Sequence, residues 1–387
     1  MLAAARISAA IEVLDRMLSG TPLEPALTNW GRANRFAGSG DRAAIRDLVF
    51  DAWRCKRSYA ALGGGDTGRS LMLGRLRARG DDPAAMFTGQ GHAPAAITDA
   101  DTARAASDLE ALDCPDWMAP RLQHSLGPDF TAIMQALQHR APVFLRVNLA
   151  RTTRDKVIAL LAADGIEAQP HPLASTSLIV LTPSRKLMTI QPYLDGLYVL
   201  QDAASQAIVV DIPAYSGLKI LDFCAGGGGK TLALAARLGS HIWAHDGEPA
   251  RMRDLPERAR RAGAKIGILT APDQQSPYDA VLVDAPCSGS GSWRRDPAGK
   301  WALTETRLAE LTALQAEILA KAAPLAAQNG VLAYATCSLL ADENQDQIAR
   351  FLQHFPDWQQ ISARHLTPLD GADGFFLSIL MRKPKNN

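Results

Sequence analysis

The sequence predicts an α/β protein whose C-terminal half forms a doubly wound sheet. Short apolar segments rich in β-branched residues alternate with helical patterns over 201–387. Such alternation is typical of a mainly parallel sheet covered by helices on both faces. Ahead of this region, 139–200 contain a smaller strand–helix–strand unit, and 1–138 have helical periodicity. We therefore predict three domains with these boundaries.

The N-terminal helices are predicted from apolar residues at helical spacing. Ile7, Ile11 and Leu14 define a first helix, and a second is expected at 41–59, before the glycine-rich break at 63–68. In the two α/β regions the pattern changes to short apolar runs bounded by turn residues. Strands are expected at 142–148, 177–181, 218–223, 241–246, 265–270, 278–285, 330–336 and 375–381, and helices at 153–165, 230–239 and 306–326.

The composition is that of a globular protein of two or three domains. The chain has 387 residues, of which 47% are hydrophobic and 21% charged, and this balance excludes wholesale disorder. Five cysteines, with no Cys-x-x-Cys pair, favour a reducing compartment over a disulfide framework or a zinc site. No signal peptide and no uncharged apolar run of about 18 residues is visible. We expect a cytoplasmic monomer with no membrane segment.

The net charge of +1 hides a basic N-terminal region. Residues 1–80 contain thirteen lysines and arginines against seven acidic residues, an excess of six positive charges. This excess fits a surface that faces RNA, and it fits an ordinary solvated helix face equally well.

A glycine-rich turn follows the first strand of the predicted large sheet. Four consecutive glycines end in Lys230, and a helix follows. Glycines let the backbone approach a ligand closely, and in a doubly wound sheet this turn is the usual nucleotide site. It is not a phosphate-binding P-loop, which would need glycine at Cys224, and a purely structural tight turn is the alternative. The candidate cofactor-binding residues are Cys224, Ala225, Gly226, Gly227, Gly228, Gly229 and Lys230.

Two aspartates at the ends of the next strands are candidate cofactor ligands. Asp246 ends the second strand, 20 residues after Gly226, where a carboxylate can accept hydrogen bonds from ribose hydroxyls. Asp273 follows the third strand and borders the same cleft. The structural alternatives are a helix cap for Asp246 and a turn residue for Asp273.

The candidate catalytic residues follow the fourth and fifth strands. The fourth strand ends in Asp284-Ala-Pro-Cys287, and the fifth ends in Ala-Thr-Cys337-Ser. Because the carboxyl ends of such strands face the ligand crevice, two cysteines there suggest thiol chemistry. Zinc is a poor alternative, since no third or fourth ligand has suitable spacing. Downstream, Trp293 and the arginines at 294–295 are expected to stack on RNA bases and contact phosphates.

Three motifs together resemble one family. DFCAGGGGKT at 222–231, DAPCSGSGSWRRDP at 284–297 and ATCSLLADENQ at 335–345 resemble the signatures of the Sun/Fmu (RsmB-type, Nop/Sun) RNA cytosine carbon-5 methyltransferases. The N-terminal helices resemble, more weakly, the NusB-like RNA-binding domain found ahead of some members. One departure is that Gly226 and Gly227 stand where the family often has Ala-Pro.

The resemblance implies a Rossmann-like domain that binds S-adenosyl-L-methionine and forms 5-methylcytosine in RNA. It implies an RRM-like fold for the small α/β unit. By family match, the loop of residues 224–230 holds the cofactor, Asp246 lies at its ribose and Asp273 near its adenine. Asp284 faces both cofactor and base and is also a catalytic candidate. The family's nucleophile falls on Cys337, and its second cysteine, which helps release the product, falls on Cys287.

This chemistry accounts for two thiols. Carbon 5 of cytosine is a weak nucleophile, and a thiolate that adds to carbon 6 activates it by splitting one hard step into easier ones. The thiol must ionise, and the cationic cofactor and Lys230 or Lys300 are the expected sources of a lowered pKa. Ribosomal RNA is expected as the substrate ahead of transfer RNA. A DNA cytosine methyltransferase and a non-catalytic RNA-binding assembly factor are the rivals. For Cys55 and Cys114 we expect only packing roles.

Overall fold

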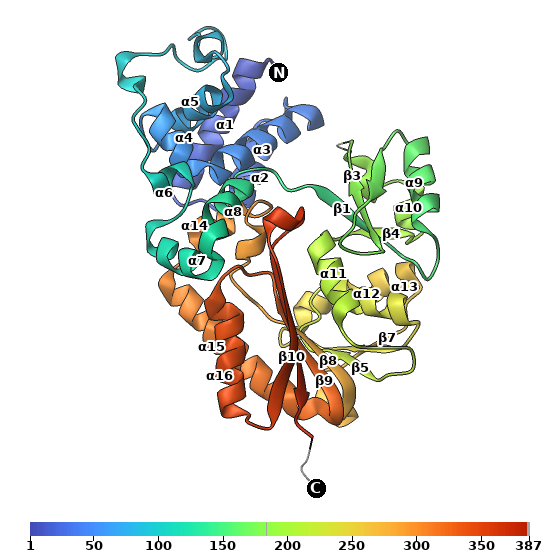
Figure 1. The fold of residues 1–387 in the computed structure, drawn as a ribbon. Coiled ribbons are helices and arrows are strands. Elements are labelled where there is room, and N and C mark those ends of the chain that lie inside the picture. Colours follow the sequence, from blue (N-terminus) through green and yellow to red (C-terminus); the bar gives the residue numbers. More distant parts are fainter. Residues whose placement is uncertain (183, 385–387) are drawn as a thin grey trace. The chain divides into compact units, whose positions relative to one another are not determined.

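The structure, a computed structural model, describes residues 1–182 and 184–384 and divides into two compact units (Figure 1). Unit 1 comprises Met1–Arg140 together with Trp293–Leu303, and unit 2 comprises Ala141–Ser292 with Thr304–Asn387. No helix among the described residues is long and apolar enough to cross a membrane. The predicted boundaries at 138 and 200 remain predictions.

Unit 1 is all helical, and its core lies among its first five helices. The predicted helix at 41–59 is broken at Cys55, where φ is −107° and ψ is 37°. The break lets α4 pack closely on α5, since a Cβ at Gly74 would lie 1.9 Å from the carbonyl oxygen of Tyr59. The helices are α1 (Ala3–Leu18), α2 (Leu23–Ala33), α3 (Ser39–Arg54), α4 (Lys56–Gly63), α5 (Gly68–Arg79), α6 (Asp108–Ala111), α7 (Ala119–Leu126), α8 (Phe130–Leu137) and α14 (Pro297–Ala302).

The segment 293–303 leaves the second unit and packs into the first. Lys300 Nζ donates to the carbonyl oxygen of Arg54 at 3.0 Å, and Trp301 Nε1 donates to that of Trp53 at 2.7 Å. Trp293 is only 1% exposed and Arg294 is buried as well. The expectation that Trp293 stacks on RNA and Arg294 contacts phosphates is therefore wrong, because their side chains are buried rather than presented to solvent.

The small α/β part of unit 2 has the β-α-β-β-α-β order of a ferredoxin-like fold. Its sheet has the order β2-β3-β1-β4, and all three pairings are antiparallel. Its core includes Leu145, Leu161 and Tyr198. The elements are β1 (Val143–Val147), α9 (Arg154–Ala163), β2 (Ala168–Pro170), β3 (Ser177–Val180), α10 (Gln191–Leu194) and β4 (Tyr198–Leu200).

The larger part of unit 2 is a seven-stranded mixed sheet of order β10-β11-β9-β8-β5-β6-β7. Strands β9, β8, β5, β6 and β7 are parallel, and β11 runs antiparallel to β9. The strands are β5 (Ile220–Asp222), β6 (Ile242–Ala244), β7 (Ile266–Ile268), β8 (Tyr278–Asp284), β9 (Ala326–Thr336), β10 (Trp358–Leu366) and β11 (Phe375–Arg382). The doubly wound α/β fold is confirmed. Strand β10 is an edge strand that the sequence pattern missed, since five of its nine residues are exposed.

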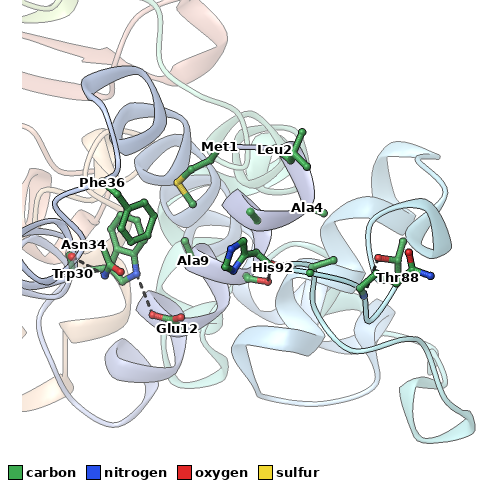
Figure 2. A pocket seen from close by; sticks show the side chains of 15 residues that line it. Met1, Leu2, Ala4, Ala9, Glu12, Trp30, Asn34, Phe36, Thr88 and His92 are labelled. Carbon is green, nitrogen blue, oxygen red and sulfur yellow. Dashed lines mark hydrogen bonds between the residues drawn. The ribbon is translucent and has the colours of Figure 1, made fainter.

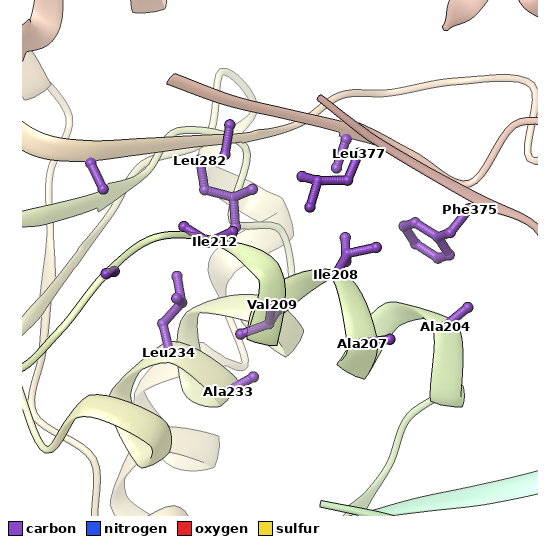
Figure 3. Close-up of a cluster of buried hydrophobic side chains, with 14 of the residues drawn as sticks. Ala204, Ala207, Ile208, Val209, Ile212, Ala233, Leu234, Leu282, Phe375 and Leu377 are labelled. Carbon is purple, nitrogen blue, oxygen red and sulfur yellow. The ribbon is translucent and has the colours of Figure 1, made fainter. Parts of the chain in front are cut away.

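Helices cover both faces of this sheet. Figure 3 shows Ile208 of α11 and Leu234 of α12 packed with Leu282 of β8 and Leu377 of β11. Successive side chains of a strand point to opposite faces, and Val281 accordingly belongs to the other core, which α15 and α16 cover. The helices are α11 (Ala203–Asp211), α12 (Gly229–Leu238), α13 (Leu255–Ala262), α15 (Glu305–Ala322) and α16 (Gln345–His354). The order of strands reverses between β5 and β8, the place where such sheets bind ligands.

Candidate active site

The glycine-rich turn joins β5 to α12 at this reversal point. Gly226 and Gly228 adopt left-handed backbone conformations, with φ of +49° and +78°. A Cβ at Gly228 would lie 2.1 Å from Cδ1 of the buried Leu255. The turn thus has a shape that side chains at these two positions would disturb, and it leads directly into the N-terminus of α12.

Asp246 lies directly against this turn. Its Oδ2 accepts a hydrogen bond from the backbone N–H of Gly226 at 2.8 Å, and its Oδ1 accepts one from Glu248 at 2.9 Å. Arg251 Nη1 lies 3.4 Å from Oδ2. Asp273 lies in a short 3₁₀ turn after β7 and is exposed. The assignments of Asp246 to the ribose and of Asp273 to the adenine remain predictions.

Sequence reasoning missed Asp222, the last residue of β5. Its carboxylate is 1% exposed, and Oδ2 accepts a hydrogen bond from Thr231 Oγ1 at 2.6 Å. Its Oδ1 is buried and has no hydrogen-bond partner among the described residues. Burial raises the pKa of Asp222 to about 7. The available signal was its position, since the last residue of the strand before the turn faces the crevice.

Replacing Asp222 with asparagine should change how the stability of the ligand-free protein depends on pH. A carboxyl whose pKa is raised by folding stabilises the native state below pH 4, and this contribution is lost as the pH rises to about 7. The wild-type protein should therefore lose free energy of unfolding between pH 5 and pH 8, and Asp222→Asn should not. The difference between the two, variant minus wild type, should increase by on the order of 2 kcal/mol over this range. Urea unfolding of both proteins at the two pH values measures this; parallel changes would contradict it.

The two cysteines meet at the ends of adjacent parallel strands. Asp284 of β8 pairs with Ala335 of β9, so Cys287 and Cys337 leave the sheet side by side. Their Sγ atoms are 3.4 Å apart, and both thiols are free. The hydrogen bond between the two thiols lowers the pKa of Cys337, while that hydrogen bond and burial raise the pKa of Cys287. The pair is therefore asymmetric, and Cys337 is the thiol that ionises first.

A lysine–aspartate pair borders the thiols. Lys230 Nζ lies 2.6 Å from Asp284 Oδ2 and 4.7 Å from the centre of the Phe375 ring. The positive charge of Lys230 further lowers the pKa of Cys337. Lys300, the other expected source, instead belongs to unit 1, where its ammonium is bound to the Arg54 carbonyl. Burial raises the pKa of the other thiols, to about 12 in Cys55 and about 11 in Cys114.

Unit 1 contains a separate pocket of about 840 Å³ (Figure 2). It lies between the first half of α1, the end of α2 and the loop at 88–93. Trp30 Nε1 donates to Glu12 Oε2 at 3.1 Å in its wall, and the Phe36 side chain stands at its edge, 73% exposed. Among the described residues, no group of three or more His, Cys, Asp or Glu side chains could hold a metal ion.

The strand order and the glycine turn after β5 are those of a Rossmann-like domain, and the family match makes it a methyltransferase that uses S-adenosyl-L-methionine. Residues 213–379 match the family described as 16S rRNA methyltransferase RsmB/F, and residues 114–185 match its ferredoxin-like domain. The chain is 34% identical over 295 residues to ribosomal RNA small subunit methyltransferase B of Serratia proteamaculans, covering 72% of this chain and 68% of that protein. The same enzyme of Yersinia pseudotuberculosis is 34% identical over 285 residues, with coverage of 70% and 66%.

The chain therefore belongs to the RsmB/F family of RNA cytosine carbon-5 methyltransferases, and it spans about two thirds of the length of these curated relatives. Solved structures agree in fold. The crystal structure of PH0851 matches with a TM-score of 0.77 and 22% identity over 99% of both chains. NSun6 from Pyrococcus horikoshii matches with a TM-score of 0.63 and 18% identity, over 70% of this chain and 99% of that one.

Proposed function

We propose that this protein methylates carbon 5 of a cytosine in ribosomal RNA. The observation that carries the proposal is the pair of thiols, 3.4 Å apart, at the carboxyl ends of β8 and β9, with Lys230 and Asp284 beside them. Both curated relatives named above are ribosomal RNA methyltransferases by name, and that supports this RNA class over transfer RNA.

The turn fits S-adenosyl-L-methionine as its ligand. Two of its glycines have left-handed backbone conformations, a Cβ at Gly228 would collide with Leu255, and the unpartnered oxygen of Asp222 lies buried at the end of β5. We propose that residues 224–230, Asp246, Asp273 and Asp284 hold the bound cofactor. The cofactor supplies an electrophilic methyl group.

The remaining chemistry belongs to this chain's own side chains. We propose that the Cys337 thiolate adds to carbon 6 of the target cytosine, which makes carbon 5 nucleophilic. Lys230 holds Oδ2 of Asp284, and Asp284 hydrogen-bonds the amino edge or nitrogen 3 of the ring and so stabilises charge that develops in the adduct. After methylation, Cys287 removes the proton from carbon 5 or assists its removal, and Cys337 leaves. The target base must be unstacked to reach both thiols.

Bisulfite sequencing of total RNA from cells with and without the protein tests the substrate. We expect one or more ribosomal cytosines to lose their protection when the protein is absent. Loss of protection only in transfer RNA would move the assignment to that substrate. If no RNA changes and the purified protein binds no S-adenosyl-L-methionine, the non-catalytic scaffold becomes the better explanation.

We propose that RNA also contacts the helical unit at the end of α2. At least seven of the thirteen basic residues in 1–80 are engaged in ion pairs, for example Arg46 with Glu24. The exposed Arg32 and Arg35 make no ion pair within the described part of the chain. Both lie within two residues of the pocket residue Asn34, and Arg35 directly precedes Phe36. An aromatic ring beside unpaired cations suits single-stranded RNA.

Reversing both charges should weaken RNA binding without affecting cofactor binding. For Arg32→Glu/Arg35→Glu we expect the Kd for ribosomal RNA to rise roughly tenfold at low salt, with a shallower salt dependence, because phosphate contacts release counterions. Filter binding across a salt series measures both. Reversing Arg46, whose charge already pairs with Glu24, is the matched control. An unchanged Kd in the double variant would exclude this surface.

A further inference from the structure

Glu343, which the mechanism above does not use, is a fully buried carboxylate beside the thiols. Its side chain is 0% exposed. Oε1 accepts hydrogen bonds from the Ser288 backbone N–H at 2.8 Å and from Gln315 Nε2 at 3.0 Å. Oε2 accepts from the hydroxyls of Ser288 and Ser338, each at 2.5 Å. No cation pairs with it among the described residues, so these four donors are what offsets the cost of burying its charge.

The four donors come from three separate segments. Ser288 follows Cys287 in the loop after β8, Ser338 follows Cys337 in the loop after β9, and Gln315 lies on α15. We call residues 285–291 and 337–342 the two cysteine loops. The Glu343 carboxylate therefore links Ser288, which follows Cys287, to Ser338, which follows Cys337.

Further hydrogen bonds join the same loops. The N–H of Gly291 donates to the carbonyl oxygen of Cys337 at 2.9 Å, and the N–H of Leu339 donates to Ser290 Oγ at 2.7 Å. Gln315 Nε2 also donates to the carbonyl oxygen of Pro286 at 2.9 Å. The Ser290 hydroxyl lies within hydrogen-bond distance of the hydroxyls of Ser288 and Ser338 as well, at 3.2 and 3.1 Å. Glu343 is the carboxylate at the centre of this network, because it accepts from both serines that adjoin the thiols and from Gln315.

The charge of Glu343 works against the chemistry. A nearby carboxylate disfavours a thiolate, and Glu343 raises the pKa of both Cys337 and Cys287. Its two oxygens are already occupied by four donors, so it is poorly placed to take or give a proton. Glu343 hinders ionisation of the thiols and yet is fully buried against the serines next to them. Its role is best explained by what it holds in place.

We infer that Glu343 is a positioning residue that fixes the two cysteine loops so that Cys287 and Cys337 stay in contact during methyl transfer. This inference rests on the proposed function. The carbonyl of a glutamine can accept the two N–H donors, and the serine hydroxyls can rotate to accept from its amide. Glu343→Gln therefore keeps the ties, whereas Glu343→Ala removes them.

The two variants separate holding from proton transfer. For Glu343→Ala we expect kcat to fall about 100-fold, since small misplacements of reacting groups cost this much, with the Kd for S-adenosyl-L-methionine unchanged. Glu343→Gln should keep most of the wild-type kcat. If Glu343→Gln is as inactive as Glu343→Ala, or if Glu343→Ala keeps its kcat, the inference is overturned. Glu317→Ala, on an exposed ion pair of α15, is the control.

A second readout does not depend on methylation. The groups that set the pKa of Cys337 are Cys287, Asp284, Lys230 and Glu343. The rate of iodoacetamide alkylation of Cys337 against pH, followed by peptide mass mapping, should show a lower pKa in Glu343→Gln because a negative charge is gone. Glu343→Ala removes the same charge but also loses the hydrogen bond between the two thiols, so the pKa of Cys337 should be higher in Glu343→Ala than in Glu343→Gln.

Equal pKa values of Cys337 in the two variants would contradict the positioning role. If the wild-type protein methylates no RNA, the proposed function fails, while the alkylation profiles still test the contact between the loops. Should Glu343→Ala not fold, Ser288→Ala/Ser338→Ala removes the two hydroxyl ties to Glu343 Oε2 and keeps the carboxylate. It is expected to lose kcat to the same extent, and retention of kcat in it would overturn the inference.

Discussion

Cys337→Ala is expected to abolish methyl transfer and covalent attachment to RNA, whereas Cys287→Ala should accumulate a protein–RNA adduct. Cys337 has the lowered pKa and so is proposed to supply the thiolate. Cys287 is its hydrogen-bond partner at 3.4 Å and is proposed to act when the adduct breaks down. Incubation with labelled RNA and S-adenosyl-L-methionine, followed by a denaturing gel, should show a slow-migrating band only for the Cys287 variant.

The reverse pattern, with the trapped band in Cys337→Ala, would exchange the two roles. Absence of the band in every variant would remove the covalent mechanism. Cys114→Ala is a suitable control, because that thiol is buried in unit 1 and burial raises its pKa to about 11. Its methylation rate should equal that of wild type once its folding has been checked by thermal unfolding.

Gly228→Ala is expected to weaken S-adenosyl-L-methionine binding by at least about tenfold. The residue has φ of +78°, where a side chain costs about 1–2 kcal/mol, and its new Cβ would force the buried Leu255 side chain to move. Both effects deform the turn that is proposed to hold the cofactor. Isothermal titration calorimetry measures the change directly.

A matched variant separates this effect from general backbone strain. Gly239, at the other end of α12, has φ of +63° and open space around its Cβ position. Gly239→Ala should lower stability to a similar small extent and leave the cofactor Kd unchanged. Equal losses of affinity in both variants would show that the turn has no special role in binding.

Much of the large sheet could be predicted because most of its strands carry their own signal. Strands β8 and β9 contain buried apolar runs, at 280–283 and 331–335, and glycines mark the turn after β5. The exposed edge strand β10 carries no such signal, because most of its residues face solvent. The break at Cys55 was also missed, since it depends on close packing of α4 on α5 at Gly74 rather than on local propensity.

The sequence by itself determined the doubly wound sheet and the placement of Cys287 and Cys337 at strand ends, because apolar periodicity and glycines act locally along the chain. Only the tertiary structure decided that Trp293 is buried, that Lys300 binds Arg54, and that Glu343 joins the two cysteine loops. These outcomes depend on hydrogen bonds and packing between residues far apart in the chain. Glu343 and Ser288 are separated by 55 positions in the sequence, and Lys300 and Arg54 by 246. Burial gives such polar contacts their strength, and no local pattern encodes which distant partner will satisfy a buried group.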